Sequence, residues 1–215
     1  MDGIPGPAFM KALDGPVLSW TAPALTDADW AHAASLAGCG VRELKAAAMV
    51  ESAGRGGFSA PCLPRALFEG HLFWRHLTRA HMDPLTALKG NTDILYKAWT
   101  KKYYIGGLDE YTRVFRAMAV NPDAALMSAS WGMFQILGSN HKACGEASVR
   151  DMVRGCMRSE AEQLAMFIRF ISGRGLIRYL KAHDWAGYAR RYNGPSYATN
   201  RYDVRLKEAY EKAGI

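Results

Sequence analysis

Two glutamates, Glu51 and Glu69, are the residues of this sequence whose positions best suit acid–base chemistry. Glu51 ends the segment VRELKAAAMVE, and helical spacing places it on one face with Val41, Leu44 and Ala48. Because Leu44 and Ala48 make that face apolar, we expect the helix to carry the carboxyl of Glu51 toward the interior.

The position of Glu51 predicts that its carboxyl holds a proton near neutral pH. Burial disfavours the charged form, and the partial negative charge at the C-terminal end of a helix disfavours it further. Gly54, Gly56 and Gly57 end the helix within its next turn. Both effects raise the pKa, so Glu51 is a candidate proton donor. From the helix alone, a glutamate that reaches solvent or a nearby arginine is the alternative.

Glu69 is the candidate second carboxylate. It lies in LFEGHLF, 18 residues after Glu51, beside Leu72 and Phe73 in a helix predicted over residues 65–80. Two helices joined by a short link tend to pack side by side, which would place the two carboxyls on opposite walls of one groove. Glycoside hydrolysis uses such a pair: one carboxyl protonates the leaving oxygen, and the other activates water or stabilises positive charge on the sugar. An ion pair with a neighbouring arginine is the alternative.

The segment SWGMFQI, residues 130–136, has the composition of a ligand-binding turn. Gly132 allows the backbone to approach a ligand, and Trp131 and Phe134 offer flat apolar faces for sugar stacking. Gln135 carries both a donor and an acceptor for a hydroxyl or an N-acetyl group. A core turn with buried aromatic side chains is the alternative.

A second turn, YNGPSY at Tyr192–Tyr197, is a further candidate for binding. Its Asn-Gly-Pro sequence, which starts at Asn193, breaks a helix between two tyrosines. A plain turn between helices is the alternative.

The histidines and cysteines predict no metal site and no cofactor. His71 and His76 are five residues apart and miss the i, i+4 spacing of a helical zinc pair. Ser52 lacks the G-x-S-x-G frame of a serine nucleophile. The cysteines have no metal-ligand spacing, so we expect free buried thiols at Cys39, Cys62, Cys144 and Cys156.

The composition predicts one mainly α-helical domain. Of 215 residues, 49% are hydrophobic and 22% charged; no apolar run is long enough for a membrane span, and the N-terminus lacks a secretory signal pattern. The net charge is +7, of which residues 148–215 contribute 13 − 7 = +6. A basic region of this kind suggests a polyanionic partner, which could be nucleic acid, an anionic envelope surface or an acidic glycan, with a merely basic solvated surface as the alternative. Since nucleic-acid-binding motifs are absent, we expect no nucleic acid partner.

Periodicity and capping signals divide the chain into an arm and a helical domain. Residues 1–24 form an irregular arm rich in proline and glycine, and Thr26 caps the first helix of a domain over residues 25–215. Residues 54–64 form a link long enough for a small hairpin or an ordered loop. The helices are predicted over residues 27–37, 41–51, 65–80, 108–120, 121–129, 148–157, 159–171, 176–183, 184–192 and 198–213.

Four blocks occur in an order that resembles a known family: MVESAGRGGF, LFEGHLF, SASWGMFQILGSNHKACG and YNGPSYATNRYDVRLKEAY. From about Thr26 onward the chain resembles the N-acetylmuramidase domain of phage endolysins, part of the lysozyme-like group, and it is also similar to goose-type lysozymes and lytic transglycosylases. The resemblance implies a mainly α, two-lobed fold with a glycan groove. It also implies cleavage of the β-1,4 bond between N-acetylmuramic acid and N-acetylglucosamine in bacterial peptidoglycan.

The resemblance also implies roles for single residues. Glu51 matches the catalytic acid of the family, and Glu69 matches the glutamate of its F-E-x-H-x-F helix, an expected second catalytic group. The link reads CLPRALFE where members often carry G-R-P, and we expect binding from the groove and the basic C-terminal region instead of a separate module. The residues expected to bind substrate are Ser130, Gln135, Tyr192, Asn193 and Tyr197.

Two other functions stay open from the sequence. A lytic transglycosylase uses one acid and gives 1,6-anhydro products. A non-enzymatic, cationic peptidoglycan-binding protein is favoured by the basic side chains of the last helix, Arg201, Arg205, Lys207 and Lys212. As for a phage endolysin, we expect a monomer that is made in the bacterial host cytoplasm without a signal peptide and is then released to the periplasm or cell wall.

Overall fold

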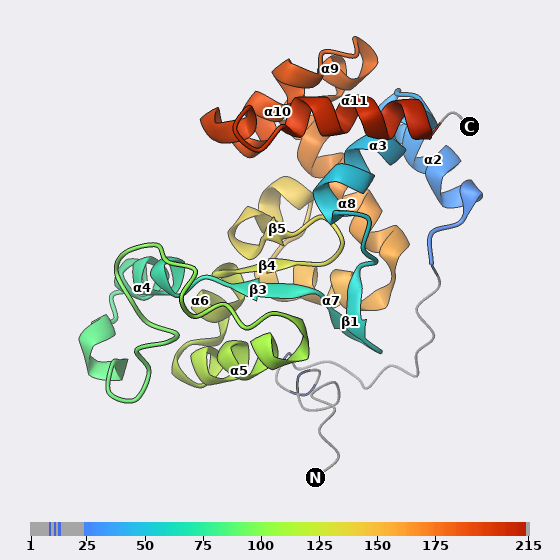
Figure 1. The fold of residues 1–215 in the computed structure, drawn as a ribbon. Helices are drawn as coiled ribbons and strands as arrows, with labels where there is room; N and C mark the ends of the chain where they lie inside the picture. The colour runs from blue at the N-terminus through green and yellow to red at the C-terminus, as the bar shows by residue number, and fades with distance from the viewer. Residues whose placement is uncertain (1–8, 10, 12, 14–23, 214–215) are drawn as a thin grey trace.

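The computed structural model describes residues 24–213 together with Phe9, Lys11 and Leu13, and in that part the chain is mainly α-helical. Figure 1 shows two groups of helices with small sheets between them. The upper group is α2 (Asp27–Ala37), α3 (Val41–Ser52), α9 (Ile177–Lys181), α10 (Trp185–Asn193) and α11 (Tyr202–Lys212). The lower group includes α4 (Gly70–Arg79), α5 (Glu110–Val120), α6 (Pro122–Met127) and α7 (Val149–Arg158). Helix α8 (Glu160–Gly173) contacts both α2 and α7 and so joins the two groups, which confirms the expected fold class.

The expected hairpin follows α3. Strands β1 (Phe58–Ala60) and β2 (Leu63–Pro64) pair antiparallel, and the link between α3 and the next elements is therefore ordered. A second antiparallel sheet has the order β3–β4–β5, from β3 (Ala66–Phe68), β4 (Ala129–Trp131) and β5 (Ile136–Leu137).

The helix predicted over residues 65–80 is wrong at its start. Its first residues form β3, and α4 begins only at Gly70, with Glu69 as its N-cap. A short apolar run such as ALF fits a strand as well as a helix, and its pairing with Ala129 and Trp131 decides for the strand. The last helix also begins later than predicted, at Tyr202, because residues 198–201 form turns and its N-cap, Arg201, has a left-handed backbone with φ of 53°.

The capping signals are confirmed. Thr26 forms a capping box with Asp29, Asn121 accepts a hydrogen bond from the Ala124 N–H, and the Ser159 hydroxyl accepts one from the Glu162 N–H. Side-chain caps therefore fix where these helices start.

The core includes two side chains of the N-terminal arm, Phe9 and Leu13. Phe9 is fully buried, with its ring centroid 5.1 Å from that of Tyr111 and 5.9 Å from that of Trp131. The carbonyl of Leu13, also buried, accepts a hydrogen bond from the Arg154 guanidinium. The expectation of an irregular arm over residues 1–24 lies mostly outside the described residues, but these two side chains are part of the main core.

The four cysteines are free thiols; Cys62, Cys144 and Cys156 are buried and Cys39 is half-buried. Among the described residues, no helix has the length and apolar composition to cross a membrane.

Candidate active site

Glu51 lies in the last turn of α3, on the predicted face. Leu44 is fully buried and Ala48 is 4% exposed on the same face, while Glu51 itself is half-buried. The helix ends directly afterwards, because Ala53 and Gly54 have left-handed backbone angles with φ of 53° and 69°. The carboxyl therefore sits at the C-terminal end of an apolar helix.

Burial raises the pKa of Glu51 to about 7. Two opposing effects limit the rise: a hydrogen bond from Asn193 and the positive charge of Arg205. The Asn193 amide nitrogen lies 3.3 Å and 3.5 Å from the two carboxyl oxygens of Glu51. Near neutral pH both protonation states of Glu51 are populated, which suits a group that gives up a proton and regains it.

Two tyrosines of α10 lie close to Glu51. Burial raises the pKa of Tyr188 and Tyr192 well above the usual value, and the Glu51 carboxylate raises it further. The Tyr188 ring stacks on that of Tyr192 at 5.5 Å, and Tyr192 also packs edge-to-face on Phe167 and Phe170. The Tyr192 ring therefore belongs to the packing behind Glu51.

The predicted turn after α10 brings Asn193, but not Tyr197, to Glu51. Asn193 is the last residue of α10, and Gly194 follows with φ of 83°. The Tyr197 hydroxyl accepts a hydrogen bond from Arg190 at 3.4 Å, and the Arg190 guanidinium lies 5.6 Å from the Tyr197 ring centroid. In the described part of the chain Tyr197 is therefore paired with Arg190.

Glu69 is held by one hydrogen bond and lies beside a histidine. Its Oε1 accepts a hydrogen bond of 2.6 Å from the Tyr104 hydroxyl, and its Oε2 lies 3.3 Å from Nδ1 of His71. The backbone N–H of Glu69 donates to the Ser128 carbonyl at 2.9 Å, and the side chain is 16% exposed. The arginine ion pair considered from the sequence is not among the contacts of Glu69 in the described residues.

A buried ion pair supports the backbone next to Glu69. Glu110 and Arg113, both in α5, form an ion pair with at most 1% exposure. Glu110 accepts the Phe68 N–H at 3.0 Å, and Arg113 donates to the Phe68 carbonyl at 3.0 Å. Glu110 also accepts the N–H groups of Ile105 and Gly106. Neither this pair nor Tyr104 is predicted from the sequence. An i, i+3 Glu–Arg pair on a helix usually lies in solvent, and Tyr104 comes from an irregular segment.

The three-stranded sheet has one buried and one partly exposed face. Leu67, Ser130 and Leu137 are direct neighbours across the strands and are all half-buried. Side chains alternate along a strand, so Glu69, two residues after Leu67, points to the partly exposed face. Ser130 pairs with Leu67 and lies on the same face. Ser130 and Glu69 are therefore brought to one side of the sheet.

Trp131 and Phe134 belong to the core, so their expected role as sugar platforms is wrong. Trp131 is 1% exposed on the opposite face of the sheet, and its indole N–H donates to the Leu126 carbonyl at 2.9 Å. Phe134 is 3% exposed and stacks on Phe167 with ring centroids 4.1 Å apart. Alternation along β4 turns Trp131 inward and leaves Ser130 on the accessible side.

Gln135 lies in the tight turn between β4 and β5 and lines a cavity. Its φ is 47°, and its side-chain N–H groups donate to the Gly132 carbonyl at 2.9 Å and the Arg65 carbonyl at 3.3 Å. The cavity has a volume of about 450 Å³, and Arg55 and Arg65 also line it. Arg65 donates to the Ser52 carbonyl at 3.3 Å, which connects this cavity to the residue after Glu51.

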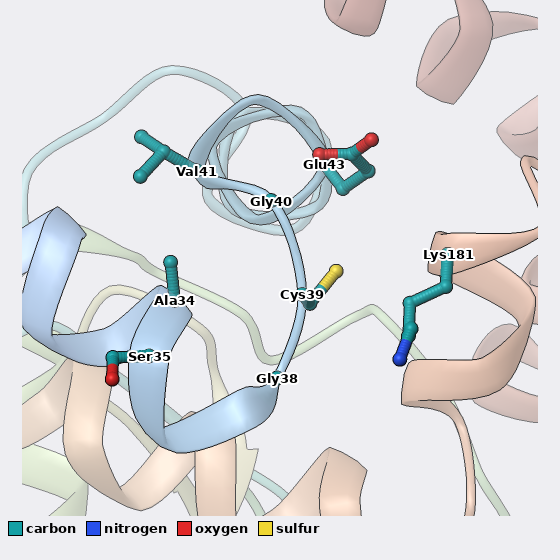
Figure 2. Close-up of a pocket in the computed structure, with 8 residues that line it drawn as sticks. All are labelled: Ala34, Ser35, Gly38, Cys39, Gly40, Val41, Glu43 and Lys181. Atoms are coloured by element: carbon teal, nitrogen blue, oxygen red, sulfur yellow. The ribbon is translucent and has the colours of Figure 1, made fainter.

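A second cavity lies away from these residues. It has a volume of about 590 Å³, and Figure 2 shows it between the α2–α3 junction and Lys181 of α9. Cys39 lines this cavity, and burial raises the pKa of its thiol to about 11. Glu43, also in the lining, has its Oε1 in hydrogen-bond contact with Nε2 of His183 at 2.9 Å. A thiol with that pKa is protonated at neutral pH and is a poor nucleophile. Among the described residues, no group of three or more His, Cys, Asp or Glu is placed to hold a metal ion.

A protonatable glutamate at a helix end, beside a small sheet that leads to a second carboxylate, is typical of the lysozyme-like class. The chain belongs to the N-acetylmuramidase family, whose family model matches residues 40–214, and it is a peptidoglycan hydrolase. Among solved structures it is similar to the Burkholderia AP3 phage endolysin, with 33% identity and a TM-score of 0.81 over 99% of this chain and 80% of that chain. A comparison with curated proteins found no match. The resemblance inferred from the sequence is confirmed.

Proposed function

We propose that this protein is an endolysin that hydrolyses the β-1,4 bond between N-acetylmuramic acid and N-acetylglucosamine, with Glu51 as the proton donor. The observation that carries the assignment is the half-buried carboxyl at the end of α3, whose pKa is about 7. A general acid is most effective when its pKa lies near the working pH.

In this mechanism Glu51 gives its proton to the glycosidic oxygen as the bond breaks. The carboxylate that forms is stabilised by the Asn193 amide, which is already within 3.5 Å of both oxygens, and by the charge of Arg205. Protonation of the leaving group and stabilisation of the resulting carboxylate therefore come from one small cluster of side chains. The same acid regains its proton from solvent after each turnover.

Glu69 acts as the base for water or as an electrostatic stabiliser of positive charge on the sugar ring. Tyr104 fixes one oxygen of this carboxylate, and the buried pair Glu110–Arg113 fixes the strand before it. Ser130 and Gln135 are proposed to contact the glycan from the sheet and its turn, while Tyr192 and Asn193 shape the surroundings of Glu51. Tyr197 stays a candidate glycan contact in this proposal, and its hydroxyl accepts a hydrogen bond from Arg190.

The variant Glu51→Gln tests the proposal, because the amide keeps the shape and removes the proton. We expect the rate of peptidoglycan cleavage, measured as new reducing ends, to fall by about 10²–10⁴-fold. Glu43→Gln on the same helix is the matched control and is expected to keep its activity. Cleavage by Glu51→Gln at the wild-type rate would rule out Glu51 as the acid.

The same digests separate the alternatives. Mass spectrometry of the released muropeptides distinguishes hydrolysis from transglycosylation, since the 1,6-anhydro product lacks one water per cut. The contact of Tyr104 with a second carboxylate favours hydrolysis. A non-enzymatic cationic protein would instead keep its bacteriolytic effect in Glu51→Gln and lose it steeply with added salt.

Binding to an anionic envelope surface would come from the basic C-terminal region, where Arg174, Arg178 and Lys181 are exposed. As an endolysin, the protein would be made in the host cytoplasm and reach the wall through a separate pore-former, acting there as a monomer.

A further inference from the structure

The cavity beside the β4–β5 turn carries two arginines on its wall. Arg55 follows α3 and is exposed, while Arg65 precedes β3 and is half-buried. Gln135, two glycines and apolar side chains such as Phe58 and Leu67 complete a mixed polar and apolar lining. The cavity thus offers two guanidinium groups as hydrogen-bond donors beside a volume of about 450 Å³.

Within the described residues, neither arginine has a carboxylate partner. Arg65 makes one side-chain hydrogen bond, to the Ser52 carbonyl, and the side chain of Arg55 makes none there. Partial burial and the nearby charge of Arg55 lower the pKa of Arg65. Seven other arginines each have a carboxylate partner within 4 Å: Arg113, Arg116, Arg150, Arg154, Arg158, Arg169 and Arg201.

Two unpaired guanidinium groups beside one cavity favour an anionic ligand. Their mutual repulsion is relieved when a carboxylate binds between them, and the planar fork of an arginine matches a carboxylate in a bidentate geometry. The site therefore favours a carboxylate over a neutral sugar hydroxyl.

The cavity is coupled to the proposed acid. The Arg65 guanidinium donates to Ser52, the residue after Glu51, and the Arg65 backbone bonds to Gly57 and Gly132. A group bound here is thus near the end of α3, within reach of the substrate whose bond Glu51 would protonate. In peptidoglycan the carboxylates belong to the peptide stems on N-acetylmuramic acid, and the glycan backbone between them is neutral.

We propose that Arg55 and Arg65 form a subsite for a carboxylate of the peptide stem, so that this enzyme prefers peptide-bearing glycan over bare glycan. The inference rests on the proposed function, since it names the part of the same substrate that this cavity binds. Arg55 and Arg65 are binding residues in this proposal, separate from the proton donor.

The test compares two substrates: soluble peptidoglycan strands with intact stems, and the same strands after an amidase has removed the stems. Wild type is expected to show a kcat/KM about 10-fold higher on the stem-bearing strands, mainly through KM. Arg55→Gln and Arg65→Gln are each expected to reduce this preference about 3- to 10-fold, and Arg65→Lys partly, because lysine keeps the charge but lacks the fork. Lys142→Gln removes one exposed charge elsewhere and is expected to keep the wild-type preference.

The subsite proposal is wrong if the wild type has the same kcat/KM on both substrates. It is also wrong if Arg55→Gln lowers kcat/KM by the same factor on both. Arg65→Gln loses the hydrogen bond to the Ser52 carbonyl and could weaken the end of α3. Arg55 is exposed, so Arg55→Gln is expected to fold and keeps the test decisive. If Glu51 is not the general acid, the result is different, because Glu51→Gln would then cleave both substrates at the wild-type rate.

Discussion

At the scale of single residues, effects of opposite sign determine the pKa of Glu51. Removal of water raises its pKa, while the amide of Asn193 and the charge of Arg205 favour the ionised form. Burial is the larger effect, and the result is a pKa of about 7 instead of 4.5. Asn193 is therefore the residue through which the working pH range of the enzyme can be shifted.

The pH profile tests this balance. Activity should decline as pH rises through about 7, because Glu51 must be protonated to act. Asn193→Leu keeps the volume but removes the hydrogen bond that favours the carboxylate, so the decline should move to higher pH even if the maximal rate falls. Rates at steps of pH from 5 to 9 on soluble strands measure the shift. A decline at unchanged or lower pH would contradict the assigned contact.

The same carboxyl makes stability depend on pH. The folded-state pKa of Glu51 lies above the unfolded value of 4.5, so the folded state binds the proton more tightly and stability falls as pH rises from about 4.5 to about 7. The loss is up to about 3 kcal/mol, because the pKa rises from 4.5 to about 7 and each pKa unit corresponds to about 1.4 kcal/mol. Glu51→Gln should lack this loss and be about 1–3 kcal/mol more stable than wild type at pH 8. Urea unfolding at pH 5 and pH 8 measures both; a less stable variant at pH 8 would refute the expectation.

At the scale of elements, Gln163 of α8 connects α7 to the link before β1 and to the β4–β5 turn. It is 2% exposed; its oxygen accepts the Met133 N–H at 2.6 Å, and its amide donates to the carbonyls of Cys156 at 2.7 Å and Gly57 at 3.4 Å. A side chain on Gly132 would meet Gln163 at 2.8 Å, and Gly132 has φ of 71°. The turn that carries Gln135 is therefore shaped around one buried amide.

Gln163→Leu should lower the free energy of unfolding by about 2–5 kcal/mol, because it leaves the Met133 N–H and the Cys156 carbonyl buried without a partner. Activity should fall with it, since the β4–β5 turn loses its support. Chemical denaturation gives the stability change, with Glu162→Gln, a neighbour on the same helix, as the control. A cost below 1 kcal/mol would mean that water or a shifted side chain replaces the amide.

At the scale of the whole molecule, the helical domain is completed by a residue near the N-terminus. Phe9 precedes the matched family region, residues 40–214, and is nevertheless fully buried. It packs on Tyr111, Phe115 and Trp131, and Trp131 is also the last residue of β4. The core behind the sheet face that carries Ser130 thus depends on the arm.

Phe9→Ala should cost about 3–5 kcal/mol of stability, the usual range for removal of a buried aromatic side chain. Leu36→Ala, at a position that is 66% exposed, is the control and should cost little. Urea unfolding followed by tryptophan fluorescence measures both, because Trp131 contacts Phe9 directly. A near-neutral Phe9→Ala would show that the arm does not hold the core in solution.

Local patterns in the sequence predicted the features that depend on near neighbours. The face of α3 that carries Glu51, the caps at Thr26 and Ser159 and the hairpin after α3 follow from spacings of a few residues. Backbone geometry determines such spacings, so they can be recognised without the rest of the chain. The family assignment follows from the same motifs.

Long-range packing determined the remaining features. The partner of Glu51, Asn193, is 142 residues away, and the partner of Glu69, Tyr104, comes from an irregular segment. The strand β3 and the burial of Trp131 depend on pairing with residues about 60 positions away in the chain. A short apolar run satisfies both helical and strand periodicity, and a polar side chain has many possible partners. Which one is made depends on how distant segments pack, and this packing is also what removes water from Glu51 and raises its pKa.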